Sequence, residues 1–424
     1  MGFLAWLKFL NKKKKMNHQK AKKKNNSIFS HLKNFLPYFF LFLLPTQLGK
    51  HFFFSFSYLN GVRVDYLAPT LYLIDIIFFL IFIFNFSLFF SFLRQKKLMF
   101  LFLILGLNLL FSLSKPIAFY SILKFFQFIF IFYFFYQTKV NDYLFLISFL
   151  SITTLEVFLA FYQLKFGKSY DGFFYFLGER HLNLSTPAIA KTSFFGQELL
   201  RPYATFSHPN SLAGFYLLFY VFLLTDKNFD RYFWLKNILL FLSSLLILFS
   251  FSKVTIILFL IINLAFYFPK IRLCWLCFLA KIITFFSIFF IFLSAKGDLL
   301  SLEKRKELIL QSLNIIKNYP LFGVGLGNYL LGQKNFSSSF PLFFNQPVHN
   351  IFLLLMAELG LPFFILILFF LIDFFKKNSK KIPLTTYYLL LTTILTGFFD
   401  HYWLTLKQNF LLLAVVFGIS LKRS

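Results

Sequence analysis

Acidic residues are scarce in this sequence. Its 424 residues include only 15 Asp and Glu against 43 Lys and Arg, and charged residues make up 14% of the chain. A soluble globular protein carries about a quarter charged residues, so this shortage excludes an ordinary soluble fold. The net charge of +28 lies in basic residues that separate apolar runs. That distribution is typical of membrane proteins, which hold Lys and Arg in cytoplasmic loops near anionic lipids, and it predicts no nucleic-acid partner.

Cysteine is almost absent. The two cysteines, Cys274 and Cys277, form the motif CWLC at the start of an apolar run. Two cysteines exclude a disulfide framework, and no second pair of ligands accompanies them for a zinc site. We therefore interpret them as small packing residues of a membrane helix and assign them no metal or cofactor role.

Apolar side chains dominate what remains. Hydrophobic residues make up 59% of the chain, 74 residues are Phe, and the mean hydropathy is +0.73. Repeated apolar runs long enough to cross roughly 30 Å of hydrocarbon predict an all-α, polytopic transmembrane helix bundle of about twelve spans. The predicted spans are 35–48, 71–93, 98–113, 117–136, 143–166, 209–225, 237–251, 254–268, 273–294, 350–372, 384–399 and 409–420.

The basic residues also predict the topology. Residues 1–33 are a basic tail whose short apolar stretch precedes its lysines, an order opposite to that of a signal peptide. With this tail inside, the short loops rich in Lys and Arg fall on the inner face, and both termini are cytoplasmic. Residues 34–424 then form one transmembrane domain in the cytoplasmic (inner) membrane. Its three long outward-facing segments, about 49–70, 167–208 and 295–349, form a partly helical loop domain.

Several polar residues fall on this predicted outer face. His349 is a candidate general base, because imidazole titrates near neutral pH and can take a hydroxyl proton. Arg201, Arg305 and Lys253 are candidate ligands of a phosphate group, although Lys lacks the forked donors of Arg. Each also has a structural interpretation, since an arginine can extend to lipid headgroups and a histidine can cap a helix. Together they suit a phosphate-headed lipid whose tail stays in the bilayer.

Other polar residues are more ambiguous. In the motif His208-Pro209-Asn210, Pro209 fits the first turn of a helix that Asn210 is expected to cap, and substrate contact by His208 and Asn210 is the alternative. Asn350 and His401 are further candidate substrate contacts. Asp400 and His401 form either a second acid–base pair or a helix anchor, and Glu358 is expected to hydrogen-bond within the bundle.

The segment 295–360 contains an expected helix and a glycine-rich turn. LSLEKRKELILQSLNII predicts an outer amphipathic helix that ends near 318–320. The following GVGLGN lacks the third glycine and the strand context of a dinucleotide site. Its glycines therefore predict a tight turn or a close backbone approach.

Three stretches of the chain resemble the O-antigen ligase and polymerase superfamily of bacterial membrane glycosyltransferases. They are RPYATFSHPNSLAGFY, KRKELILQSLNIIKNYPLFGVGLGNYL and VHNIFLLLMAELGLPFFILIL, with a weaker fourth, FFDHYWLTLKQNFLLL. The resemblance covers roughly residues 30–420. Where members of the superfamily often carry Ser-Arg-Gly in a membrane helix, this chain has FSFSKVTI with Lys253.

The resemblance implies a function. Such enzymes transfer a glycan from undecaprenyl diphosphate to an acceptor hydroxyl outside the cytoplasmic membrane, without a nucleotide sugar or a catalytic metal. It implies that His349 activates the acceptor, while Arg201 and Arg305 bind the diphosphate. The acceptor is a glycan, a lipid or a protein, so the ligase, polymerase and protein O-oligosaccharyltransferase branches stay open, and membrane lipids surround the chain.

Two other functions are compatible with the composition. A transporter or flippase of lipid-linked saccharides would share a cationic site, but it would be expected to show inverted repeats and broken helices near the middle of the membrane. Neither is evident in the sequence. A non-enzymatic membrane scaffold would leave the outer cationic cluster unexplained.

Overall fold

The structure is a computed structural model, and it describes residues 31–93, 96–194, 196–267, 282, 286, 288–289, 299–336 and 345–423. Almost all of the predicted basic tail (1–33) and most of the predicted span 273–294, with Cys274 and Cys277, lie outside this part of the chain. So does the loop 337–344 within the predicted outer segment 295–349.

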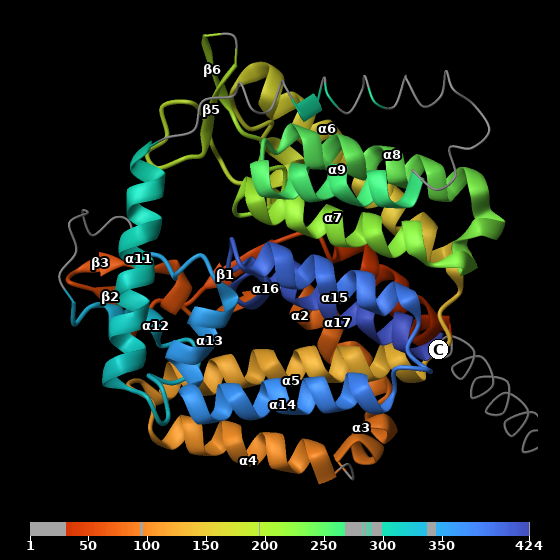
Figure 1. The fold of residues 1–424 in the computed structure, drawn as a ribbon. Helices are drawn as coiled ribbons and strands as arrows, with labels where there is room; N and C mark the ends of the chain where they lie inside the picture. Colours follow the sequence, from red (N-terminus) through yellow and green to blue (C-terminus); the bar gives the residue numbers. More distant parts are fainter. Residues whose placement is uncertain are drawn as a thin grey trace, which may run out of the picture.

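Most of the described chain is helical. Most of the long helices run side by side along one direction, whereas α11 (Leu299–Asn318) lies across that direction (Figure 1). The all-α fold class is therefore confirmed. Residues 31–43 form the first helix. The others are α2 Leu73–Phe84, α3 Phe86–Leu93, α4 Lys96–Leu110, α5 Lys115–Gln137, α6 Asp142–Phe166, α7 Pro209–Thr225, α8 Phe233–Phe249, α9 Lys253–Tyr267, α11 Leu299–Asn318, α12 Tyr329–Gln333, α13 Ile351–Leu359, α14 Leu361–Lys377, α15 Leu384–Gly397, α16 Tyr402–Thr405 and α17 Lys407–Lys422.

The number of membrane spans differs from the prediction. In the described part of the chain, 3 helices are long and apolar enough to cross a membrane: Lys115–Gln137, Asp142–Phe166 and Lys227–Phe249. Five more apolar helices are shorter, at Leu73–Phe84, Met99–Leu110, Pro209–Thr225, Lys253–Phe266 and Leu384–Gly397. Twelve spans are therefore not confirmed. The chain is nevertheless an integral membrane protein by its apolar helices, and its outer surface carries exposed Phe79, Phe241 and Phe369 where lipid would lie.

Two of the predicted spans are each broken into two helices. Residues 71–93 divide at Asn85 into α2 and α3, and residues 350–372 divide at Gly360 into α13 and α14. The break at Gly360 is filled by the chain around the GVGLGN motif, because Leu361 N–H donates to Pro320 O and Val324 N–H donates to Ala357 O. Backbone groups released by the broken helix are therefore satisfied by protein rather than by a cavity.

The glycines of GVGLGN permit a close backbone approach, as predicted. Gly325 and Gly327 have φ values of 96° and 72°, a region that side chains rarely adopt. A Cβ atom at Gly325 would lie 2.3 Å from Ser112 Cβ, and one at Gly327 would lie 2.3 Å from Ser121 Oγ. The predicted amphipathic helix is also confirmed as α11, which buries Leu308 and Ile315.

The core is centred on α7 and α17. Side chains of α7 from Pro209 to Leu223 are buried almost without exception, as expected of a helix that is apolar on all sides. α7 packs against α8, α15 and α17, while α17 also packs along α5. Gly214 of α7 leaves room for the Tyr402 ring, which a Cβ atom there would meet at 2.3 Å. α16 is therefore fixed against the start of α7.

Strands occur only as short antiparallel pairs within the described residues. All fall in predicted outer loops, except that residues 71–72 of β4 (Thr70–Tyr72) belong to the predicted span 71–93. β1 (Gly49–His51) pairs with β4 (Thr70–Tyr72), β2 (Tyr58–Leu59) with β3 (Val62–Arg63), and β5 (Lys191–Phe194) with β6 (Gln197–Leu200). β1 to β3, β5, β6, α11 and α12 lie toward one end of the bundle, at the left of Figure 1.

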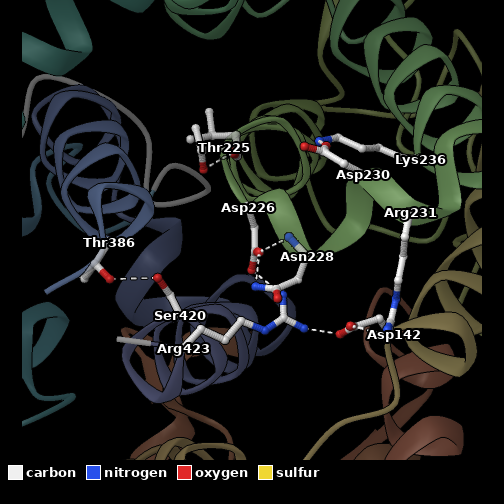
Figure 2. Close-up of polar contacts among 11 residues, drawn as sticks. Asp142, Thr225, Asp226, Asn228, Asp230, Arg231, Lys236, Thr386, Ser420 and Arg423 are labelled. Atoms are coloured by element: carbon white, nitrogen blue, oxygen red, sulfur yellow. Dashed lines mark hydrogen bonds and ion pairs between the residues drawn. The ribbon is translucent and has the colours of Figure 1, made fainter.

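The opposite end carries the C-terminus and the short basic loops (Figure 1). Figure 2 shows Arg423, just after α17, between two carboxylates. It pairs with Asp142 at the start of α6 and with Asp226 after α7. Arg231 also reaches Asp142, at 2.9 Å. The described parts of the segments predicted to be outer and inner thus lie at two ends of the bundle.

Candidate functional site

Three helix boundaries meet at the end of the bundle that holds the predicted outer loops. His208 precedes α7, His349 lies two residues before α13, and Asp400 and His401 lie between α15 and α16. Each boundary brings polar side chains to the end of an apolar helix. The sequence therefore assembles the site from residues that are far apart along the chain.

A chain of polar contacts connects Arg201 to His349. Arg201 Nη2 donates to Asn210 Oδ1 at 2.7 Å, and Asn210 Nδ2 donates to Asp400 Oδ2 at 2.9 Å. The other carboxylate oxygen of Asp400, Oδ1, lies 3.4 Å from His349 Nδ1. Arg201 Nε is fixed in turn by Ser250 O at 2.9 Å. The candidate base and one candidate phosphate ligand are therefore members of one network.

His349 is held loosely within this network. Among the described residues its Nδ1 has an ion-pair partner in Asp400 but no hydrogen bond of good geometry. The side chain is 16% exposed, and its ring lies 5.0 Å from that of His401. A small rotation would bring Nδ1–H onto the carboxylate, which leaves Nε2 as the nitrogen free to accept a proton.

His208, rather than Asn210, caps α7. Pro209 begins α7 as predicted, but the cap is His208, whose Nδ1 accepts the backbone N–H of Asn210 at 3.1 Å. The expectation that Asn210 caps the helix is wrong. Asn210 lies inside the first turn, and its amide is engaged by Arg201 and Asp400.

Asn350 and His401 are both anchored by the protein. Asn350 caps α13 by accepting N–H bonds from Phe352 and Leu353 at 2.9 and 3.0 Å, and its Nδ2 donates to Phe398 O. His401 Nδ1 lies 2.7 Å from Thr405 Oγ1. Asn350 thus has little capacity left for a substrate, whereas His401 still presents Nε2.

The other two candidate phosphate ligands lie near the network without a direct contact to it. Arg305 on α11 is close enough to act electrostatically on Arg201 and His401. Lys253 is exposed at the start of α9, three residues after the Ser250 carbonyl that binds Arg201. The structure therefore gathers Arg201, Arg305, His208, His349 and His401 around Asp400, with Lys253 at the margin.

Burial sets the charges in this cluster. It lowers the pKa of His208, with Arg201 acting in the same direction, and it lowers the pKa of His401 despite the adjacent Asp400. Burial alone would raise the pKa of Asp400, but His349 and His401 lower it below its usual range. At neutral pH the site therefore combines one ionised carboxylate, two neutral imidazoles and flanking arginines.

A cavity of about 390 Å³ opens beside these residues. Its lining includes His208, His349, Asp400 and His401, and also Lys124 and Lys407. Arg201, Arg305 and Lys253 are not among its lining residues; of the described arginines, Arg180 is the one that lines it. The cavity is of the size that holds a small part of a glycan or a phosphate group.

Among the described residues, His349, Asp400 and His401 form a group that could hold a metal ion, with ligand atoms within 4.8 Å of one another. Their surroundings oppose a cation. Asp400 already accepts hydrogen bonds from Asn210 and from the His401 backbone N–H, and Arg201 and Arg305 add positive charge. These hydrogen bonds and positive charges would compete with a metal ion for the Asp400 carboxylate.

The sequence analysis did not include in the candidate site three Lys and Arg residues that line the cavity. Arg180 lies in a loop whose sequence gives no signal, and it donates to Ser207 O at 3.1 Å. Lys124 lies within the predicted span 117–136, and Lys407 lies just before the predicted span 409–420. A lysine within an apolar span is itself a signal of function, and it singles out Lys124.

One comparison with known proteins gives a match. Residues 238–368 match the family model described as O-Antigen ligase. The matched region runs from α8 to α14 and includes Lys253, Arg305, His349 and Asn350. No curated protein and no solved structure matches the chain.

Proposed function

We propose that this chain, whose residues 238–368 match the O-antigen ligase family model, transfers a glycan from undecaprenyl diphosphate to an acceptor hydroxyl. Transfer would occur at the outer face of the cytoplasmic (inner) membrane. The observation that carries the proposal is the contact chain from Arg201 through Asn210 and Asp400 to His349, of which Asp400 and His349 line the 390 Å³ cavity. It couples a base to a phosphate-binding cation.

The first half of the reaction is proton removal. His349 Nε2 takes the proton of the acceptor hydroxyl as its oxygen attacks the anomeric carbon of the donor sugar. The imidazolium that forms directs Nδ1–H toward Asp400, 3.4 Å away, whose negative charge stabilises it. The fixed Asn210 amide in turn holds the Asp400 carboxylate in place.

The second half is departure of the lipid diphosphate. The bond between the anomeric carbon and the diphosphate oxygen breaks, and its electron pair leaves with undecaprenyl diphosphate. Arg201 and Arg305, with Lys253, stabilise the negative charge that develops there. Attack from the face opposite the leaving group inverts the configuration at the sugar carbon.

The transporter alternative gains no support from the broken helix at Gly360. A transport site would use the ends of the broken helix to line a cavity. Here Gly360 faces backbone, since a Cβ atom on it would lie 2.4 Å from Leu321 O, and the cavity beside His349 is lined by other residues.

The function is tested with purified protein in liposomes that contain an undecaprenyl-diphosphate-linked glycan and candidate acceptors. We expect release of undecaprenyl diphosphate together with an acceptor extended by the glycan, and an unchanged rate in the presence of a metal chelator. Movement of the intact lipid-linked donor between leaflets, without release of undecaprenyl diphosphate, would instead identify a transporter.

Arg305→Gln tests the diphosphate ligands. We expect kcat/KM for the donor to fall by roughly 10- to 100-fold, because the variant loses a cation that opposes the charge of the leaving group. Lys306→Gln is the matched control, since it removes an exposed neighbouring charge from the same helix. Equal losses in the two variants would argue for general surface electrostatics rather than a ligand at Arg305.

A further inference from the structure

Two lysines, Lys124 and Lys407, line the same cavity as His349. Lys407, the first residue of α17, pairs with Asp75 of α2 at 2.6 Å. Asp75 Oδ1 also accepts Gln127 Nε2 at 2.9 Å, and its Oδ2 accepts the Tyr72 backbone N–H at 2.9 Å. Asp75 is therefore saturated, and it neutralises Lys407.

Lys124 has no such partner. Among the described residues, no carboxylate lies within ion-pair distance of its ammonium group, and its nearest ring contact is Tyr120, whose centroid is 4.9 Å away. Asp75 and Glu358 attract Lys124 only from a longer range. The Glu358 carboxylate is itself held by the backbone N–H groups of Gly327 and Tyr329.

The position of Lys124 makes this charge costly. It lies nine residues into α5, which is roughly 13 Å along the helix axis and so well within an apolar span. A cation at such depth needs a partner or water, and Lys124 meets the cavity that also reaches His349. Of the two lysines that line the cavity, Lys124 is the one with no ion-pair partner among the described residues.

We propose that Lys124 forms a binding subsite for an oxyanion, a phosphate or a carboxylate group, carried by one of the two substrates of the reaction. This proposal rests on the proposed glycan transfer, and it adds that one of the two substrates must carry an oxyanion. The oxyanion would accept hydrogen bonds from the Lys124 ammonium group while the reacting sugar lies toward His349. The oxyanion comes either from the donor, as one of its phosphates, or from the acceptor, as a charged group on its saccharide or lipid.

The first test measures binding without turnover. Protein in nanodiscs is titrated with inorganic phosphate and pyrophosphate by calorimetry, with chloride held constant. We expect Lys124→Met to weaken binding by roughly 10- to 100-fold, the effect of losing one charge-assisted hydrogen bond, and Lys124→Arg to retain it. Lys115→Met removes an exposed lysine of the same helix and should leave binding unchanged. Unchanged binding in Lys124→Met would overturn the subsite.

The second test identifies the source of the oxyanion. In the transfer assay, Lys124→Met should raise KM for the donor alone or for the acceptor alone, and the substrate affected is the one that carries the group. Unchanged KM values for both would overturn the proposal. His349→Ala should bind phosphate as the wild type does, although it should transfer little glycan. The binding test therefore reports on the subsite even if the proposed glycan transfer is wrong. A melting temperature for Lys124→Met equal to or above that of the wild type would show that the variant is folded.

Discussion

His349→Ala is expected to lower kcat for glycan transfer by about 10² to 10⁴-fold, the usual contribution of a general base. The variant removes the imidazole that would take the acceptor proton, while Arg201, Asn210 and Asp400 keep their own contacts. KM for the donor should change little, because His349 holds no phosphate in the proposed mechanism. The measurement is steady-state transfer by the reconstituted protein.

Asp400→Asn is the companion variant for this experiment. It keeps the size of the side chain but removes the charge 3.4 Å from His349 Nδ1, so the imidazolium loses its stabilising partner. We expect kcat to fall by less than it does in His349→Ala, and we expect the pH dependence of kcat to shift. A His349→Ala protein that melts like the wild type and transfers glycan at the normal rate would remove His349 from the mechanism.

Several polar residues that the sequence singled out are neighbours in the structure, and their roles stay predictions. Their arrangement was not predicted. Helix propensity and hydropathy are local properties, which explains why α11 and the start of α7 at Pro209 were predicted well. The placement of Asn210 between Arg201 and Asp400 depends on contacts with residues 9 and 190 positions away along the chain, which no local pattern reveals.

The broken helices were missed for a related reason. An apolar run such as 350–372 has the composition of one span, and hydropathy does not register the positive φ of 83° at Gly360. The break depends on backbone partners from residues 320–325, which pack into it from another segment. The cavity is also a property of the assembled bundle, so Arg180 carried no signal in the sequence.

Arg423→Ala is expected to produce the largest loss of stability. Arg423 pairs with Asp142 and Asp226 at the end of the bundle opposite the cavity, and its side chain is 16% exposed while that of Asp226 is 5% exposed. Removing one member of a buried ion pair costs about 3–5 kcal/mol, because the remaining charge stays buried without compensation. The three residues belong to α17, α6 and the turn after α7, so the variant should also loosen the packing of these helices (Figure 2).

Arg231→Ala provides the matched comparison for Arg423→Ala. Arg231 pairs with the same Asp142, but its side chain is 62% exposed, so its loss should cost no more than about 1 kcal/mol. Thermal unfolding of the two variants in detergent micelles measures this difference in stability. Raising the salt concentration should reduce the loss of stability caused by Arg231→Ala more than the loss caused by Arg423→Ala. Equal melting temperatures for the two variants would show that the C-terminal arginine does not hold these helices together. Because this cluster is remote from His349 and Lys124, any Arg423→Ala protein that remains folded should keep its phosphate affinity, which separates the stability of the bundle from the chemistry at its other end.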